Sequence, residues 1–163
     1  LRGMQLMRAG GRTVSFDPNL RPTLWPSPER MRDAINGLAT QADWVFPGIE
    51  EGRVLTGIDT AEGIARFYRD RGARLVVVKL GPEGAYFDSE GGCGHVAGFP
   101  VEQVVDTVGA GDGFAVGVIS ALLEGRSVSD AVRRGAWIGA RAVQVPGDTE
   151  GLPSRRQLEE SGL

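Results

Sequence analysis

Two acidic and three small residues share one short stretch, residues 106–112, just before an apolar segment that is typical of a helix. Gly109, Ala110 and Gly111 have little or no side chain, so their backbone N–H groups can approach an anion at the positive end of a helix dipole. Asp112 is poorly suited to holding that anion, but it can accept a proton from a hydroxyl while a phosphoryl group arrives. The stretch therefore favours phosphoryl transfer, with Asp112 as general base and the three-residue backbone as anion hole.

Three other interpretations of this stretch can be weighed from residue type and spacing. Asp112 could simply cap the helix, because Asp is a favoured N-cap residue, and this alternative stays open. A P-loop is excluded, because no Gly-x-x-x-x-Gly-Lys-Ser/Thr segment occurs in the sequence. A dinucleotide-binding fingerprint is excluded as well, because Phe114 stands where a third glycine or alanine is needed.

The elements that must position this stretch alternate along the chain. Residues 74–80 are the strongest strand prediction, because a continuous β-branched run suits a parallel strand that is covered on both faces. The alternation of strands with helices predicts an α/β fold with a largely parallel sheet, formed by residues 1–163 as one domain. Strands are expected at 12–16, 43–47, 74–80, 85–88 and 93–97, and helices at 1–9, 28–39, 49–55, 60–71, 111–124, 129–145 and after 154.

The composition of the chain limits the kinds of binding partner and the cellular compartment that we expect. The net charge of −3 argues against a nucleic-acid coat or a membrane-surface protein, and the sequence has no apolar run long enough to span a membrane. The single cysteine, Cys93, has no internal disulfide partner and fits a reducing compartment, so we expect a cytoplasmic protein. Cys93 and His95 alone make a poor metal site.

Residues 106–119 are similar, position for position, to the C-terminal signature of the ribokinase-like (PfkB) carbohydrate kinases. The resemblance covers essentially the whole chain and corresponds to the C-terminal half of that family. It implies the C-terminal portion of a ribokinase-like three-layer fold, without the N-terminal strands and the lid. Four further segments resemble family landmarks in the family's order, and these are residues 16–22, 42–47, 55–57 and 78–84.

The resemblance implies the same roles for the loop as its chemistry does: Asp112 is the catalytic base, and the glycines before it form the anion hole. It also implies that Gly81 lies near the phosphates of ATP. Lys79, the only lysine in the chain, could steer the nucleotide, or it could simply extend from a buried strand to solvent. The residues implied to bind ATP are Lys79, Gly81, Gly84, Gly109 and Gly111.

Two carboxylates are implied as metal ligands. Glu51 matches the acid of an Asn-x-x-Glu pattern that organises Mg2+ and phosphate through water in many family members, although Gly48 replaces the asparagine here. Asp106 matches a residue that often helps to hold a monovalent cation such as K+ beside the nucleotide. An aspartate at this place could instead fix its own turn through local hydrogen bonds. ATP, Mg2+ and a monovalent cation are therefore the implied cofactors.

Arg21 bears on the class of sugar. It follows a strand end, where α/β folds place their ligands, and its guanidinium can match a carboxylate bidentately. Arg21, Asn19 and Asp112 are thus the expected substrate contacts, and the surrounding segments look most like the branch that converts 2-keto-3-deoxygluconate to its 6-phosphate. Fructokinases share a similar segment, so a neutral ketose is the alternative.

A function of another class also has to be considered. Family members take most of their sugar contacts from an N-terminal half that is not visible in this sequence, so the chain could be a non-catalytic nucleotide-binding fragment. The expected partners are small molecules, a sugar or sugar acid and ATP, with no nucleic acid and no membrane. Relatives often dimerise, which makes a homo-oligomer a further expectation.

Overall fold

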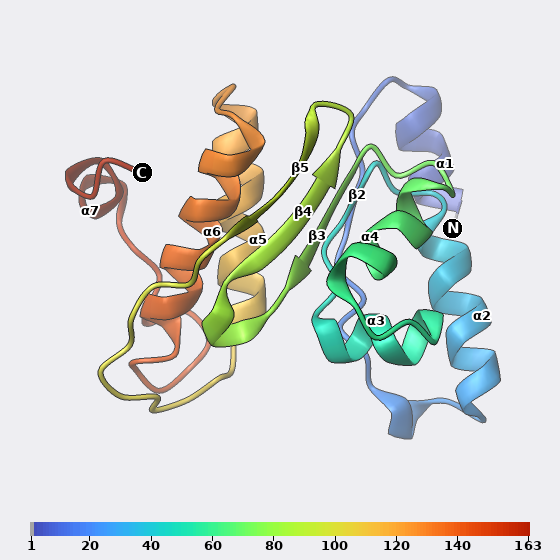
Figure 1. Cartoon of the computed structure of the whole chain (residues 1–163), viewed down its shortest axis with the longest axis horizontal. Coiled ribbons are helices and arrows are strands. Elements are labelled where there is room, and N and C mark those ends of the chain that lie inside the picture. The colour runs from blue at the N-terminus through green and yellow to red at the C-terminus, as the bar shows by residue number, and fades with distance from the viewer. Residues whose placement is uncertain (1) are drawn as a thin grey trace. The chain divides into compact units, whose positions relative to one another are not determined.

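A computed structural model describes residues 2–163 and shows helices beside one sheet of five strands (Figure 1). β1 pairs with β2, and β2 with β3, in parallel. The predicted α/β class with a largely parallel sheet is therefore confirmed. In spatial order the strands are β1 (Ser15–Phe16), β2 (Trp44–Val45), β3 (Leu75–Lys79), β4 (Ala85–Ser89) and β5 (Gly92–Val96).

The helices also lie where the sequence places them. The predicted first helix included Leu1, which lies outside the described residues, and the helix expected at 129–145 ends earlier, at Ala142. Ser27 caps α2 as expected, accepting a hydrogen bond from the Arg30 N–H at 3.3 Å. The helices are α1 (Arg2–Ala9), η1 (Pro22–Leu24), α2 (Pro28–Ala39), α3 (Ile49–Thr56), α4 (Ala61–Arg69), η2 (Gly81–Glu83), α5 (Ala110–Leu123), α6 (Val128–Ala142) and α7 (Arg155–Glu160).

Two expectations about local structure were wrong in extent. The strands expected at 12–16 and 43–47 are regular over only two residues each, β1 and β2. The 3-10 turns η1 and η2 were not predicted, although each contains a proline at its start, which fixes the backbone for such a turn. These differences lie at strand ends and in connections, where hydrogen bonding to neighbours decides the conformation.

The chain divides into two compact units, and the first contains the residues up to Lys79 together with Tyr86–Cys93. Its centre is β3, of which Val76, Val77 and Val78 are fully buried, as the continuous apolar run predicted. In this unit α4 packs on β3, α3 on α4, and α2 on α3.

One buried tyrosine joins these three helices. The hydroxyl of Tyr68 on α4 donates to Asn36 Oδ1 on α2 at 3.0 Å. The amide of Asn36 donates in turn to the carbonyl oxygen of Leu55 on α3 at 2.9 Å. Burial raises the pKa of Tyr68, so the hydroxyl keeps the proton that this chain of hydrogen bonds requires.

The second unit contains residues Leu80–Ala85 and Gly94–Leu163, and its core is the pair α5 and α6. The two helices meet at glycines: a Cβ on Gly117 would lie 2.7 Å from the Cα of Gly135. Arg134 is buried between them and donates to Glu124 Oε2 at 2.7 Å and to the carbonyl oxygen of Leu163 at 3.1 Å. This close packing fixes the direction in which α5 runs.

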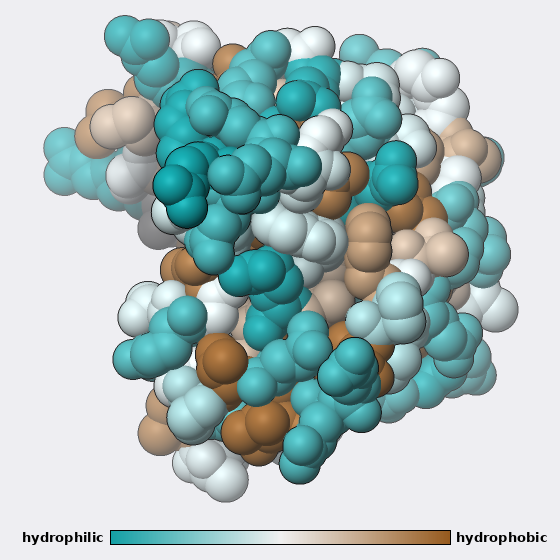
Figure 2. Space-filling view, turned by 90° about the vertical axis from the view of Figure 1, so that its left-hand side faces the viewer, coloured by the Kyte–Doolittle hydropathy of each residue, from teal (hydrophilic) through white to brown (hydrophobic). Residues whose placement is uncertain are grey.

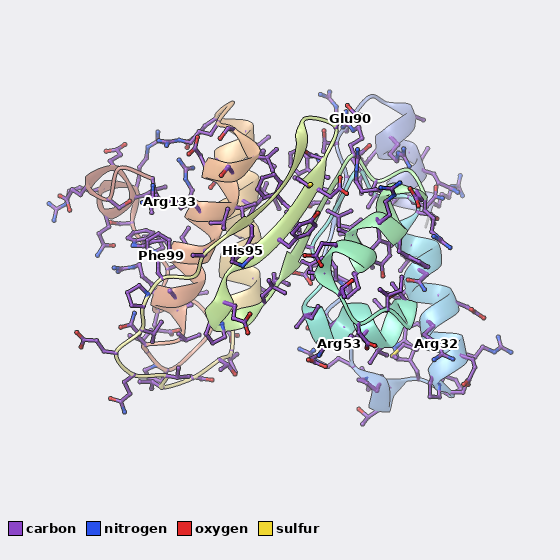
Figure 3. The ribbon with its side chains drawn as sticks, viewed as in Figure 1. Arg32, Arg53, Glu90, His95, Phe99 and Arg133 are labelled. Atoms are coloured by element: carbon purple, nitrogen blue, oxygen red, sulfur yellow. The ribbon has the colours of Figure 1, made fainter. Side chains whose placement is uncertain are left out.

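The segment between β5 and α5 is irregular and belongs to the second unit. Figure 3 shows Phe99 of this segment beside Arg133 of α6, whose guanidinium carbon lies 5.9 Å from the ring centre. The face shown in Figure 2 is mostly hydrophilic, with apolar groups exposed chiefly in its lower half. Among the described residues, no helix is long and apolar enough to cross a membrane.

Candidate functional site

Gly109 sets the start of α5. It is the N-cap of the helix and has a φ of 74°, in the left-handed region that glycine tolerates. A Cβ at this position would lie 2.3 Å from the carbonyl oxygen of Asp148, so a side chain has no room. Both observations require glycine here, and they explain how the chain can turn sharply into a helix at the end of the 106–109 segment.

The backbone amides that follow are the candidate anion site. The Gly113 N–H donates to the Gly109 carbonyl oxygen at 2.8 Å, which begins the helical pattern. In the part of the chain that the structure describes, the N–H groups of Gly111 and Asp112 have no hydrogen-bond acceptor. Exposed N–H groups in the first turn of a 14-residue helix are suited to an anionic ligand.

Asp112 lies at the third position of α5 rather than at its N-cap. Its side chain is exposed, and no hydrogen bond or ion pair engages it among the residues from 2 to 163. The interpretation that Asp112 serves as the N-cap is therefore wrong, since the cap is Gly109. The carboxylate is available to accept a proton.

Asp106 is held by two backbone amides. Its Oδ1 accepts from the Val108 N–H at 3.0 Å, which is the local turn that the sequence left open as an alternative. Its Oδ2 accepts from the Gly147 N–H at 3.3 Å, a contact that the sequence did not predict. These hydrogen bonds, that of Val108 first, lower the pKa of Asp106, so the carboxylate is charged. A cation at Asp106 stays a prediction.

In the first unit, the candidate sugar residues lie in the loop after β1. Asn19 is exposed and has a φ of 42°, and it is the one non-glycine residue with positive φ among those described. Arg21 is exposed, and its guanidinium donates to the carbonyl oxygen of Leu20 at 2.9 Å. The loop thus presents a cation and an amide from a strained backbone.

Glu51 and Lys79 each contact the loop after β1. Glu51 Oε1 accepts from the Leu20 N–H at 2.7 Å. Lys79 Nζ lies 2.5 Å from Asp17 Oδ2. The structure therefore brings Glu51, Lys79 and the loop together within the first unit, whereas the metal role of Glu51 and the ATP role of Lys79 stay predictions. Sequence reasoning assigned no role to Asp17.

The two glycines around η2 differ in their surroundings. Gly81 has a φ of 60°, and a Cβ there would meet no atom of the chain within 4 Å. Gly84 has a φ of 97°, and a Cβ there would lie 2.0 Å from the carbonyl oxygen of Val96. Gly84 is thus required by backbone packing, while Gly81 leaves open space beside the turn.

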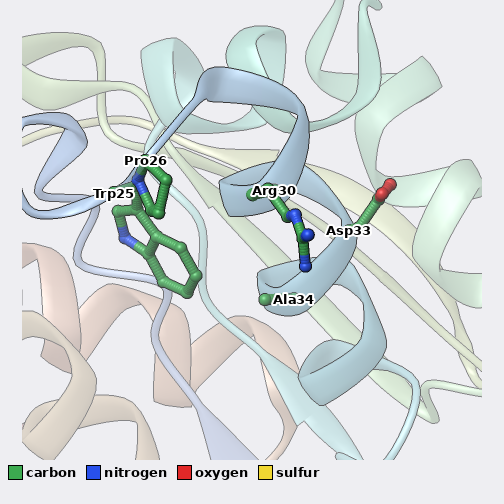
Figure 4. A pocket seen from close by; sticks show the side chains of 5 residues that line it. All are labelled: Trp25, Pro26, Arg30, Asp33 and Ala34. Carbon is green, nitrogen blue, oxygen red and sulfur yellow. The ribbon is translucent and has the colours of Figure 1, made fainter.

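A hollow lies in the surface of the first unit. Its volume is about 680 Å³, and it contains none of the predicted site residues (Figure 4). No cluster of three or more His, Cys, Asp or Glu side chains that could hold a metal ion occurs in the described part of the chain. The residues that line the hollow are Trp25, Pro26, Arg30, Asp33 and Ala34.

The fold and the comparisons with known proteins together define the class of this chain. Residues 2–155 match the model of the pfkB family carbohydrate kinases, and the chain belongs to that family. It is 58% identical to a 2-dehydro-3-deoxygluconokinase of Bacillus subtilis (strain 168) over 95% of its own length and 48% of the relative's. The chain thus spans about half the length of the curated relatives that it matches.

Solved structures show the same likeness. A PfkB protein from Polaromonas sp. JS666 is 70% identical, with a TM-score of 0.87 over 97% of this chain and 49% of that one. A fructokinase double mutant from Vibrio cholerae O395, solved with fructose, ADP and potassium ion, is 31% identical, with a TM-score of 0.88 over 98% of this chain and 53% of that one. The predicted ribokinase-like fold is therefore confirmed for this chain.

The requirement for glycine at position 109 can be tested by unfolding. We expect Gly109→Ala to destabilise the protein by more than the roughly 1–2 kcal/mol that a left-handed backbone alone costs, because the new Cβ also meets the Asp148 carbonyl. Gly125→Ala is the matched control: its φ is 76°, but a Cβ there meets no atom within 4 Å. Urea unfolding of both variants measures the difference, and equal losses would contradict the role of the Asp148 contact.

Proposed function

We propose that this chain is the phosphoryl-transfer half of a kinase that uses ATP to convert 2-dehydro-3-deoxygluconate (2-keto-3-deoxygluconate) to its 6-phosphate. The observation that carries the proposal is the start of α5, where, within residues 2–163, the N–H groups of Gly111 and Asp112 and the carboxylate of Asp112 have no partner. An anion hole beside a proton acceptor is the arrangement that phosphoryl transfer to a hydroxyl needs. The 58% identity to the Bacillus subtilis kinase supports this choice of substrate.

In the proposed reaction Asp112 is the general base. The hydroxyl oxygen of the sugar attacks the γ-phosphorus of ATP, the bond from that phosphorus to the β-phosphate oxygen breaks, and ADP leaves. The hydroxyl proton passes to the carboxylate of Asp112. The backbone of Gly109, Ala110 and Gly111 stabilises the charge on the transferred group, because its N–H groups lie at the positive end of α5.

The remaining ATP contacts are proposed from the family pattern. Gly81 and Gly84 flank the turn after β3, and the open space beside Gly81 supports a nucleotide there. Mg2+ bound to ATP would neutralise charge on the phosphates, and it typically needs only one or two protein carboxylates. Glu51 and Asp106 are the proposed carboxylates for Mg2+ and a monovalent cation, and each is already held in place by two backbone N–H groups.

Arg21 and Asn19 are proposed to bind the sugar, with Arg21 paired to the carboxylate of the acid. An exposed guanidinium that bonds only its own loop can rotate to a ligand at little cost, which supports this assignment. Phosphorylation of fructose is the second candidate, and the likeness to the Vibrio cholerae fructokinase favours it. We further propose that both units form one partial domain, acting in the cytoplasm.

The third candidate is a nucleotide-binding fragment without activity. The chain spans about half the length of its relatives, which supports this candidate. The test compares two polypeptides with 2-dehydro-3-deoxygluconate, fructose and ATP. One is this chain alone, and the other is a complete kinase in which the chain follows an N-terminal half of this family. Turnover of the acid sugar by the complete kinase supports the proposal. Faster turnover of fructose would make fructose the substrate in place of 2-dehydro-3-deoxygluconate.

The role of Asp112 predicts the effect of Asp112→Asn in the complete kinase. We expect kcat to fall about 10²- to 10⁴-fold, the usual contribution of a general base, with little change in the KM for either substrate. Asp130→Asn is the matched control, because Asp130 also lies in the first turn of a helix, α6. A kcat within about twofold of the parent for Asp112→Asn would show that another group takes the proton.

The role of Arg21 predicts a change in substrate preference. Arg21→Ala should raise the KM for 2-dehydro-3-deoxygluconate about 10- to 100-fold, since a charge-assisted hydrogen bond contributes about 1.5–3 kcal/mol. The KM for ATP should not change. Arg32→Ala is a suitable control, because Arg32 lies on α2 (Figure 3) and pairs with Glu29 on the surface. Unchanged affinity for the acid sugar in Arg21→Ala would remove Arg21 from the substrate site.

A further inference from the structure

Asp17, at the start of the loop that carries Asn19 and Arg21, is tied to the end of β3. Asp17 Oδ2 and Lys79 Nζ are 2.5 Å apart, and their side chains are only 19% and 16% exposed. The backbone of Lys79 is fixed as well, because its N–H donates to the Pro47 carbonyl oxygen at 2.8 Å. An ion pair between two largely covered side chains is screened less by solvent than a surface pair, so it constrains the loop more than a surface pair does.

Glu51 holds the same loop at a second point. Its Oε1 accepts from the Leu20 N–H at 2.7 Å, and its Oε2 accepts from the Gly48 N–H at 2.9 Å. One carboxylate therefore joins the loop after β1 to the first turn of α3. Each oxygen has a defined donor, so the side chain has little freedom to rotate.

The backbone between these two anchors is strained. Asn19 has a φ of 42°, in the left-handed region that L-residues adopt rarely and that asparagine tolerates better than most. Leu20 and Trp25 also pack on the buried cluster of Met31, Ile35 and Leu55. Strain of this kind is maintained only where neighbouring contacts determine the loop, and Arg21 follows directly.

We propose that Lys79 and Glu51 are positioning residues for the sugar: they hold the Asp17–Arg21 loop in the conformation from which Asn19 and Arg21 bind the acid substrate. This inference rests on the proposed function. It assigns the main task of Lys79 to the sugar loop rather than to ATP, and it gives Glu51 a second task beside the metal role proposed above. Neither Lys79 nor Glu51 touches the sugar in this role.

If Lys79 holds the loop, its loss should change the KM for the sugar, whereas if Lys79 binds ATP, its loss should change the KM for ATP. If Lys79 holds the loop, Lys79→Met in the complete kinase raises the KM for 2-dehydro-3-deoxygluconate about 10- to 100-fold and leaves the KM for ATP within about twofold. Asp17→Asn also raises the KM for the sugar, because it removes the same ion pair from the other side. Glu51→Gln also raises the KM for the sugar, because Gln offers a single acceptor oxygen to two N–H groups.

Arg69→Met is the matched control. Arg69 pairs with Asp88 in the same unit at 3.1 Å, with side chains 19% and 22% exposed, but it does not contact the loop. It should lower the melting temperature about as much as Lys79→Met and leave the KM for the sugar unchanged. This comparison separates a general loss of stability from a loss of loop position.

Three outcomes would overturn the inference and leave the proposed function intact. A raised KM for ATP with an unchanged KM for the sugar in Lys79→Met assigns Lys79 to the nucleotide. A similar rise in the KM for the sugar in Arg69→Met shows that any loss of stability has this effect. If Lys79→Met does not fold, the KM for the sugar is measured in Asp17→Asn instead. An unchanged KM in that variant contradicts the positioning role of Lys79. A parent enzyme without activity on the acid sugar would instead overturn the proposed function, and the inference with it.

Discussion

Gly109 combines a φ of 74° with a close approach to the carbonyl oxygen of Asp148, and the start of α5 depends on both. The turn at this residue leaves the N–H groups of Gly111 and Asp112 without acceptors in the described chain, while the Ala110 N–H donates to the Thr107 carbonyl oxygen at 3.4 Å, and it places Asp112 in the first turn rather than at the cap. Asp106 holds the same two segments together through Gly147. The glycine contact between α5 and α6 then fixes the helix itself. The free N–H groups of Gly111 and Asp112 are thus a consequence of backbone geometry that a larger side chain at position 109 would prevent.

In the first unit the site depends on parallel pairing. Parallel strands end at the same edge of a sheet, so the loops after β1, β2 and β3 can meet there. Asp17 follows β1, Gly48 follows β2, and Lys79 ends β3. The Lys79 side chain reaches the first of these loops, and Glu51 joins the first to the second. The residues at this edge bind one another closely, and the loop that carries Arg21 has little conformational freedom left.

The sequence predicted the α/β class and most helices, because apolar spacing and caps such as Ser27 act locally. It also predicted that a helix begins at these small residues, because Gly109, Ala110 and Gly111 have a pattern of their own, whereas the binding of phosphate there stays a prediction. The Lys79–Asp17 pair could not be predicted, since 62 residues separate the partners and only the strand order brings them together. The contact of Asp106 with Gly147 was missed for the same reason. The short extent of β1 and β2 depends on their neighbours rather than on their own residues.

The central claim is that the backbone N–H groups at the start of α5 bind the phosphates of the nucleotide. Amide NMR spectra of the 15N-labelled complete kinase, titrated with ADP and separately with inorganic phosphate, test it most directly. The account predicts that the amides of Gly111 and Asp112 shift most with both ligands, because they have no acceptor within the described chain. Saturable shifts that leave these two amides unchanged, with the largest changes elsewhere, would contradict it.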